Sequence, residues 1–524
     1  MAVVAHPVVT DLTARISSST GSPSTCDLDT RIWHRVEKEL YLFTSPHKKA
    51  WLYVALANEE DLASEDLVVE DICVGEQPPI PSSGYSWEER PGGIWVLRSK
   101  FSGNIDQVVT DVDVLFGTDA VDPRPQRILT RSSLQLDAPL QVPVARLSIL
   151  HGRAVPDARA PLRIRKDGKF KIVQISDTHM VTGVGLCKDA IDVHGKHLPK
   201  SEADPLTVDF IGKILDVEKP DLVILSGDQL HHDVSDTQSA LFKVVAPIIA
   251  RSIPFAAIFG NHDSEGTHAL SRIEQMSILE NLPFSLCESG PEQVDGIGNF
   301  YLQVLAPVPS QIPVSTFYFL DSHGQIPSRT HNPDYEPIKQ SQIDWFTNTS
   351  HAQQSARQIN NNGQRFYISL AFLHIPLPEF KDRHLRIYNG HRWEPTECPS
   401  SNSHFYDALV RGGISALGCG HDHVNDFCAL LPQQTQQDSD KAPYPGPWLC
   451  YSGGSGFGGY CSYGRKRFHR RMRVWEVNAS NGSLKTWKRV EYSIDRVDEI
   501  SLVESGAVVD SPGEQNEGRS CVVT

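Results

Sequence analysis

The sequence predicts an α/β protein in which a parallel-sheet domain follows a smaller all-β domain, and two patterns carry this prediction. Over residues 31–150, short apolar or alternating runs such as "KAWLYVAL" and "GIWVLRSKF" are broken by glycine, proline and acidic turns, as in antiparallel strands. From residue 170 onward, buried-strand patterns alternate with amphipathic helix patterns, which indicates parallel βαβ units. We expect a disordered segment at 1–30, a β-rich domain at 31–150, a linker at 151–169, an α/β domain at 170–492 and a solvated acidic tail at 493–524.

The α/β domain begins with the buried-strand pattern "FKIVQIS" at 170–176. In the helix predicted over 203–219, Leu206, Phe210 and Ile214 recur at i, i+4 and i+8, and Asp204 is expected to be its N-cap. A second strand is expected at 221–226, then a helix interrupted at Pro247, then a third strand at 254–259. Further strands are expected at 316–322, 365–374 and 413–421, and a closing hairpin at about 472–492.

Composition excludes several classes of protein. The formal net charge of −15 on 524 residues argues against a general nucleic-acid binder. No segment approaches ~18 apolar residues without charge, so we expect no membrane span. The N-terminus lacks a signal-peptide pattern and the ten cysteines form no CxxC pair, so we expect reduced thiols and a location in the cytoplasm or, given "RKR" at 465–467, the nucleus. Oligomeric state is left open.

Polar side chains follow the expected strands at the points where each strand ends. They are Asp177 and His179, Asp228, Asn261 with His262 and Asp263, His374, and His421 and His423. Taken singly, such residues are ordinary turn formers or structural histidines. Because the carboxyl ends of parallel strands meet at one edge of a sheet, their joint occurrence predicts a common site there.

The residue types indicate a metal site. Aspartate, asparagine and histidine without thiolate suit manganese, iron, zinc or magnesium-like ions. Seven protein ligands are too many for one catalytic ion with an open position, and they suit two ions ~3.5–4 Å apart with Asp228 as the bridge. His262 is not needed as a ligand and is free to act on a leaving group, and we expect Asp263 to orient its imidazole.

The blocks "DTH", "GDQ", "GNHD", "FLH" and "GHDH" together resemble the calcineurin-like metallophosphoesterases over about residues 165–490. This resemblance implies a four-layer fold, in which helices flank a central β-sandwich. It implies that one ion is held by Asp177, His179, Asp228 and His423. It implies that the other is held by Asp228, Asn261, His374 and His421, with His262 catalytic.

A narrower resemblance covers most of residues 31–490. Segments such as "GKFKIVQISDTHMVTGVG" and "LPFSLCESGPEQVDGIGNF" are similar to the fungal phosphatases named for a dosage-dependent cell-cycle regulator and to the short purple-acid-phosphatase-like proteins. The resemblance implies a phosphatase that hydrolyses phosphoserine or phosphothreonine in proteins, by attack of a metal-bridged hydroxide on phosphorus. Two alternatives stay open: a small-molecule or nucleotide phosphatase or phosphodiesterase, and a non-enzymatic regulatory scaffold.

The sequence departs from related patterns at two places. Purple acid phosphatases carry a tyrosine three residues after the bridging aspartate, where this chain has His231, so no Fe(III)–tyrosinate absorption band is expected. The string "GDQLHHD" differs from the GDxxDRG of calcineurin-type protein phosphatases. A glycine-rich segment at 451–473 is interpreted either as a phosphate-binding loop or as a surface strand.

Overall fold

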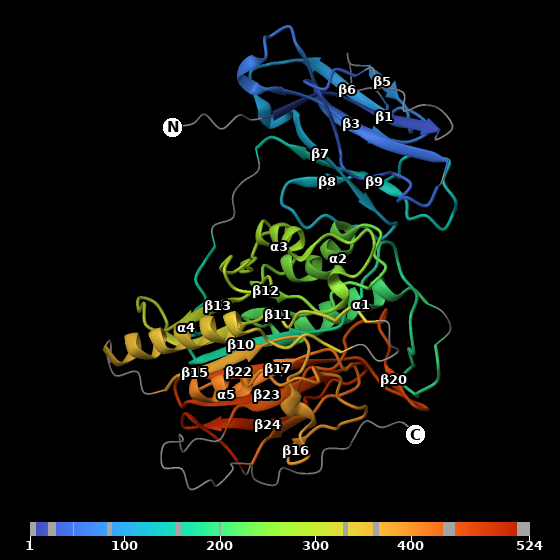
Figure 1. Cartoon of the computed structure of the whole chain (residues 1–524). Coiled ribbons are helices and arrows are strands. Elements are labelled where there is room, and N and C mark those ends of the chain that lie inside the picture. Colours follow the sequence, from blue (N-terminus) through green and yellow to red (C-terminus); the bar gives the residue numbers. More distant parts are fainter. Residues whose placement is uncertain are drawn as a thin grey trace. The chain divides into compact units, whose positions relative to one another are not determined.

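The computed structural model describes residues 7–18, 28–45, 47–80, 86–153, 159–198, 201–328, 334–359, 366–432 and 446–510. The chain divides into two compact units, which are described separately (Figure 1). The first unit comprises Met1–Asp157 with the short stretches Thr182–Val184 and Gln238–Ala246, and the second comprises the rest. Within the described ranges, no helix combines the length and hydrophobicity needed to cross a bilayer.

The first unit is built from small antiparallel sheets, which confirms the all-β prediction for this region. Its described strands form three sheets with the orders β1-β3-β2, β4-β6-β5 and β7-β9-β8. The strands are β1 (Pro7–Ser18), β2 (Trp33–Arg35), β3 (Lys48–Asn58), β4 (Leu67–Val74), β5 (Trp87–Arg90), β6 (Ile94–Lys100), β7 (Val109–Phe116), β8 (Arg127–Leu129) and β9 (Ala145–His151). Alternate residues of these strands, such as Leu52, Val96 and Leu147, meet in one apolar core.

The prediction of disorder at the N-terminus is wrong for residues 7–18. Strand β1 pairs with β3 along its whole length, from Pro7 opposite Asn58 to Ser18 opposite Lys48. Its Val8 and Leu12 are fully buried. A register shift between Val9 and Asp11 breaks the regular alternation, which is why the strand pattern is hidden among serine and threonine residues. Residues 1–6 and 19–27 lie outside the described ranges.

The second unit contains two seven-stranded sheets among its described residues. One has the order β12-β11-β10-β22-β23-β24-β25 and the other β13-β14-β15-β17-β19-β18-β16. The strands of the first are β10 (Lys169–Ile175), β11 (Leu222–Ser226), β12 (Phe255–Ile258), β22 (Arg471–Asn478), β23 (Ser483–Val490), β24 (Val497–Glu504) and β25 (Ala507–Val508). Those of the second are β13 (Phe300–Leu305), β14 (Pro313–Phe319), β15 (Ile368–Phe372), β16 (Arg386–Asn389), β17 (Ala416–Cys419), β18 (Cys428–Leu430) and β19 (Trp448–Tyr451). A short hairpin, β20 (Ser462–Tyr463) and β21 (Lys466–Arg467), lies outside both sheets.

The two sheets pack face to face, with helices on the outside. Ile172 and Ile224 of one sheet and Leu370 and Phe372 of the other belong to the same buried cluster. The helices of this unit are α1 (Ala203–Glu218), α3 (Arg272–Glu280), α4 (Gln340–Ile359) and α5 (Phe405–Arg411), whereas most of α2 (Thr237–Ile249) belongs to the first unit. Apolar side chains of α4 and α5 pack on the outer face of the second sheet. Helix α1 lies on the first sheet, where its Glu218 bonds to residues of β10 and β23. This arrangement confirms the four-layer fold.

Two details of the helices differ from the sequence prediction. Helix α1 begins at Ala203 with Glu202 as its N-cap, so Asp204 lies in the first turn. Pro247 lies inside α2 rather than interrupting it. Proline removes one N–H from the helix, and the helix ends two residues later, at Ile249.

The C-terminal segment is also more ordered than predicted. The hairpin of β22 and β23 is present as expected. Residues 493–524 were expected to be a solvated tail, but β24 and β25 extend the first sheet, and Ile500 and Leu502 are buried. Four consecutive residues of β24, from 500 to 503, are buried, so this part of the strand is covered on both faces. Residues 511–524 lie outside the described ranges.

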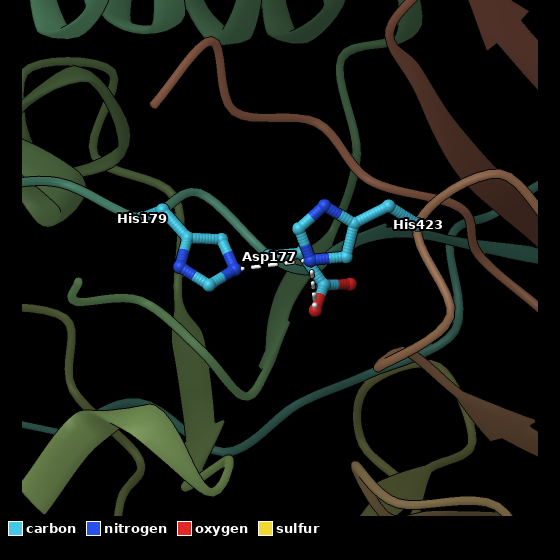
Figure 2. A group of neighbouring side chains, drawn as sticks. All are labelled: Asp177, His179 and His423. Carbon is cyan, nitrogen blue, oxygen red and sulfur yellow. Dashed lines mark hydrogen bonds and ion pairs between the residues drawn. The ribbon is translucent and has the colours of Figure 1, made fainter. Parts of the chain in front are cut away.

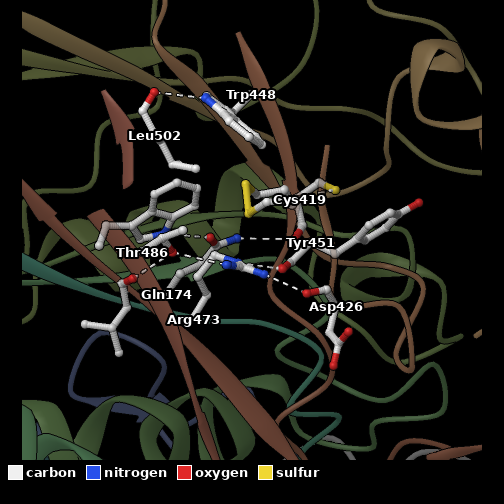
Figure 3. The surroundings of a disulfide bond; sticks show 12 residues. Gln174, Cys419, Asp426, Trp448, Tyr451, Arg473, Thr486 and Leu502 are labelled. Carbon is white, nitrogen blue, oxygen red and sulfur yellow. Dashed lines mark hydrogen bonds between the residues drawn. A yellow bond between two sulfur atoms is a disulfide. The ribbon is translucent and has the colours of Figure 1, made fainter. Parts of the chain in front are cut away.

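The expectation of reduced thiols is wrong for one pair of cysteines. Cys428 of β18 and Cys450 of β19 face each other across the antiparallel pair and form a disulfide, which is buried (Figure 3). Beside it, the guanidinium of Arg473 donates to the carbonyl oxygens of Tyr451 (2.7 Å) and Asp426 (2.8 Å). Arg473 therefore ties the end of β19 to the loop that precedes β18. A disulfide is typical of chains that fold in an oxidising compartment.

Candidate metal centre

Side chains from several strand ends converge at one edge of the sandwich. Strand β10 leads to Asp177 and His179, β11 to Asp228, β12 to Asn261, β15 to His374, and β17 to His421 and His423. All seven residues are buried. The carboxylate and imidazole atoms form two groups, within each of which all ligand atoms lie within 4.8 Å of one another.

The first group consists of Asp177, His179 and His423. The two Nε2 atoms of His179 and His423 are 3.0 Å apart, and His423 Nε2 lies 3.5 Å from Asp177 Oδ1. Figure 2 shows both imidazoles and the carboxylate turned toward a common point. Two imidazole nitrogens that both carry lone pairs repel each other when they are so close together. A cation bound to both nitrogens would remove this repulsion.

The second group consists of Asp228, His374 and His421. His374 Nε2 lies 3.2 Å from Asp228 Oδ2, and the rings of His374 and His421 are 5.2 Å apart. The same Asp228 Oδ2 lies 3.7 Å from His179 Nε2 of the first group. Asp228 therefore stands between the two groups, where a bridging carboxylate would be needed.

The buried polar atoms of the site fit metal ions. Asn261 Oδ1, His374 Nε2 and His421 Nε2 are buried and have no hydrogen-bond partner in the part of the chain that the structure describes. Such orphaned atoms are costly unless a cation engages them. The Nδ1–H groups of His374 and His423 donate to the carbonyl oxygens of Ser226 (2.9 Å) and Tyr460 (2.7 Å), so each Nε2 keeps its lone pair for a metal.

The electrostatics of the site also favour cations. Burial lowers the pKa of His423 to about 3 and the pKa of His179 and His421 well below the usual value, so these imidazoles are neutral at physiological pH. Burial is the main reason why the pKa of the Asp177 carboxyl rises to about 7, and repulsion from Asp228 adds to it. At His374, burial opposes protonation, but the carboxylates of Asp228 and Asp177 outweigh it and raise the pKa to about 9. The two buried carboxyl groups therefore favour a positive charge between them, which a metal ion would supply in place of that proton.

The backbone is strained at the ligand positions. Asp177, His179, Asp228 and His421 have φ angles of 57°, 46°, 50° and 78°, in the left-handed region. For residues other than glycine this conformation costs ~1–2 kcal/mol each. Such strain is found mainly where function requires a side chain to be aimed.

The glycine-rich part of the segment holds the ligand loops, whereas its residues 462–467 form the exposed hairpin of β20 and β21, in agreement with the interpretation as a surface strand. Residues 452–459 are buried, and the N–H groups of Ser455 and Gly456 donate to the carbonyl oxygens of Ser176 and Asp177. A Cβ atom at Gly459 would lie 2.6 Å from His423 and 2.7 Å from His179. Glycine is therefore required here because the backbone lies against both imidazoles.

His262 lies beside the metal centre with part of its side chain exposed. Its ring centroid is 5.5 Å from that of His179, and its side chain is 32% exposed, so a substrate can reach it. Its Nδ1 lies 2.5 Å from Glu265 Oε2. Burial opposes protonation of His262, but the carboxylates of Asp228 and Glu265 outweigh it and raise the pKa to about 9.

The structure corrects the role expected for Asp263. Its buried carboxylate accepts hydrogen bonds from the backbone N–H groups of Gly260 (2.7 Å), Leu230 (2.9 Å) and Asp228 (3.0 Å). It therefore fixes the backbone of two ligand loops, while Glu265 takes the position next to His262. Sequence reasoning missed Glu265. The sequence could have indicated Glu265 because it lies three residues after His262, a spacing that brings two side chains together in a 3₁₀ turn.

We expect Asp263→Ala to destabilise the protein. Three buried N–H groups lose their acceptor, and each unsatisfied group costs ~1–3 kcal/mol, so the free energy of unfolding should fall by about 3 kcal/mol or more. Urea denaturation of the metal-free protein, followed by tryptophan fluorescence, measures the change. Asp209→Ala, at an exposed position of α1, is the matched control. An unfolding midpoint equal to that of the control would contradict the role assigned to Asp263.

His231 occupies the position of the metal-ligating tyrosine of purple acid phosphatases, but its ring nitrogens bond to other side chains. Its Nδ1 lies 2.6 Å from Asp233 Oδ1 and its Nε2 lies 2.8 Å from the Nζ of Lys188. Its ring is 5.9 Å from that of His179. Both ring nitrogens are thus engaged at the rim of the site.

The fold and site together define a dinuclear metallophosphoesterase: a helix-flanked β-sandwich with two histidine–aspartate groups at the strand ends. The family of calcineurin-like phosphoesterases matches residues 170–425, and the chain belongs to this family. It is 34% identical over 404 residues to Phosphatase DCR2 of Saccharomyces cerevisiae. The aligned region covers 74% of this chain and 65% of the yeast protein. The match therefore spans just under two thirds of that relative's length.

A plant relative and a solved structure complete the comparison. The chain is 35% identical over 354 residues to the probable inactive purple acid phosphatase 29 of Arabidopsis thaliana, covering 64% of this chain and 85% of the plant protein. A dimetal phosphatase from Danio rerio aligns with a TM-score of 0.40 and 12% identity, over 64% of this chain and 99% of that structure. Because this TM-score is low, the assignment to the family depends on the family match and on the geometry of the site.

Proposed function

We propose that the chain is a dinuclear metal-dependent phosphatase that hydrolyses phosphomonoesters, with phosphoserine and phosphothreonine of proteins as its substrates. One observation carries the proposal: a complete set of buried ligand side chains with the partly exposed His262 beside it. The resemblance to fungal phosphatases supports the choice of a protein substrate.

The two groups suggest how the ions are shared. Asp177, His179, Asp228 and His423 would hold one ion. Asp228, Asn261, His374 and His421 would hold the other. The nitrogen and oxygen donors suit manganese, iron or zinc. Because His231 stands where purple acid phosphatases carry a tyrosine, we expect no tyrosinate absorption band from the centre.

The proposed mechanism assigns a separate task to each group of residues. Two bound ions would lower the pKa of a bound water to near neutrality and offset charge on the phosphoryl oxygens. The buried ligand loops exclude bulk water and fix the position of the phosphoryl group. His262, protonated and held through Nδ1 by Glu265, presents its other nitrogen to the leaving oxygen and donates a proton as the ester bond breaks.

A second candidate function is a non-enzymatic role, which the word "inactive" in the names of the Arabidopsis relatives favours. The ligand set argues for the enzyme, because a site without a catalytic role has no need to bury seven metal-ligating side chains in strained loops. A small-molecule or nucleotide phosphatase or phosphodiesterase would use the same centre.

Elemental analysis combined with an activity assay tests the proposal. The purified chain, reconstituted with manganese, iron or zinc, should contain about two ions. It should hydrolyse a phosphoserine peptide faster than it hydrolyses bis-p-nitrophenyl phosphate or nucleotides. Turnover of the diester or of nucleotides alone would support the alternative substrates. Two ions without turnover of any ester would support the non-enzymatic role.

Its partners and location follow from the same proposal. A phosphoprotein is the partner that we infer, and neither nucleic acid nor a membrane is expected. The cytoplasmic or nuclear location stays a prediction, and the Cys428–Cys450 disulfide speaks against a reducing compartment. Alkylation of the chain in intact cells, followed by mass spectrometry, decides whether these two thiols are oxidised there.

A further inference from the structure

A cavity of about 350 Å³ lies next to the metal centre. It is lined by segments that are far apart in the sequence, among them Asn261, Glu265, Arg272, Asp321, His323 and Glu336. Asn261 is 3% exposed and its Oδ1 is without a hydrogen-bond partner among the described residues, so the cavity opens directly beside a group that awaits a ligand. A substrate whose phosphoryl group sits at the metal centre would place its neighbouring atoms here.

The arginine of this cavity is not available to a second anionic group. One N–H from Nε and two from Nη2 of Arg272 donate to Ser264, Gly260 and His323, and Nη1 pairs with Asp321. The carboxylate of Asp321, in turn, accepts from the backbone N–H groups of Ile297 and His323. The Arg272–Asp321 pair is therefore an internal support of the cavity wall, with its charges balanced.

Two further carboxylates, those of Glu265 and Glu336, reach the surface of the cavity, and that of Glu265 is already paired with His262. The Glu265 side chain is 33% exposed and the Glu336 side chain 36% exposed. Glu336 pairs with Lys339, three residues further on in the non-helical segment before α4, but such an exposed pair contributes little stability and an incoming cation can compete with it. His323 is engaged through Nε2 with Gln342 Oε1 at 2.7 Å.

We propose that this cavity is a specificity site that accepts a positively charged group next to the scissile phosphate, such as an arginine or lysine that adjoins a phosphorylated residue. The inference rests on the proposed function and narrows its substrate class. A cationic side chain would pair with the carboxylate of Glu336, whereas an acidic neighbour or a second phosphate group would be repelled by it. Nucleoside diphosphates and triphosphates are thereby disfavoured.

The test compares two phosphoserine peptides that differ only in the residue after phosphoserine, arginine or glutamate. For the metal-loaded enzyme we expect kcat/KM to be at least about tenfold higher for the arginine peptide. Glu336→Lys should remove most of this preference. Glu504→Lys makes the same charge change at an exposed position of β24 and should keep it. Thermal unfolding confirms that both variants are folded.

A binding measurement separates the specificity site from the catalytic function. Fluorescence anisotropy with non-hydrolysable phosphonate versions of the two peptides should show the same preference and the same loss in Glu336→Lys. Equal affinity for the two peptides would overturn the specificity site, even if both phosphopeptides are hydrolysed. A preference in binding without turnover of p-nitrophenyl phosphate or any phosphopeptide would uphold the site and reject the phosphatase.

Discussion

Replacement of Asp228 by asparagine is expected to leave the protein folded but without its pair of ions. The amide oxygen can still accept the hydrogen bond that His262 N–H now donates to Asp228 Oδ1, at 2.9 Å. The negative charge shared between the two groups is lost, and with it the bridge. Because the ions supply several kcal/mol of transition-state stabilisation, turnover should fall by about 10³-fold or more.

Two measurements check this result. Elemental analysis should find fewer than two ions per chain, and the rate on p-nitrophenyl phosphate should fall in parallel. Asp209→Asn, which neutralises an exposed aspartate of α1, is the matched control and should retain both ions and full activity. If Asp228→Asn keeps two ions and wild-type turnover, Asp228 is not the bridge and the dinuclear site is wrongly assigned.

Replacement of His262 by alanine should separate chemistry from metal binding. The side chain contacts no ion in the proposed arrangement, so two ions should remain bound. General acid catalysis contributes ~10²–10⁴-fold, and turnover of a phosphoserine peptide should fall within that range. The loss should be much smaller for p-nitrophenyl phosphate, because its leaving group departs without a proton. His351→Ala, at an exposed position of α4, serves as the control. Loss of the ions, or an equal loss on both substrates, would argue against a proton-donating role.

The pH dependence of the reaction tests the pairing of His262 with Glu265. The folded protein holds the pKa of His262 at about 9, above its ordinary value, so the imidazolium is present below that pH and is lost above it. Glu265→Gln removes one of the charges that raise this pKa. The alkaline limb of the kcat/KM profile should therefore move to lower pH, with the metal content unchanged. A kcat/KM profile that does not shift in Glu265→Gln would contradict the pairing of His262 with Glu265.

The general architecture and the gathering of polar residues at strand ends could be predicted from the sequence because both depend on local patterns. A continuous apolar run such as the one that becomes β11 is buried on both faces, and whatever follows it must emerge at the sheet edge. The positions of Asp177, Asp228 and His374 follow from this rule. The left-handed backbone of Asp177 and Asp228 and the distances between the three side chains do not, because these depend on how loops from different strands contact one another.

The errors of sequence interpretation have a common physical origin. Strands β1 and β24 were missed because serine, threonine and acidic residues break up their apolar runs, and because their buried residues come in consecutive groups, such as 12–14 and 500–503, and not in alternation. Asp263 and Glu265 both lie close to His262 in the sequence, and only the 3₁₀ turn decides which carboxylate faces the ring. The cavity beside Asn261 joins four separated segments, so no local pattern could predict it.

The left-handed residues of the ligand loops have a consequence for the protein as a whole. Without cations, the chain must hold an unfavourable backbone, and the buried carboxyl groups of Asp177 and Asp228 repel each other. Ions that bind only the native form add about 2.7 kcal/mol of stability at a hundred times their dissociation constant. The cations therefore belong to the folding energetics of this unit as much as to its chemistry. A melting curve recorded during metal titration would report how fully the centre is loaded.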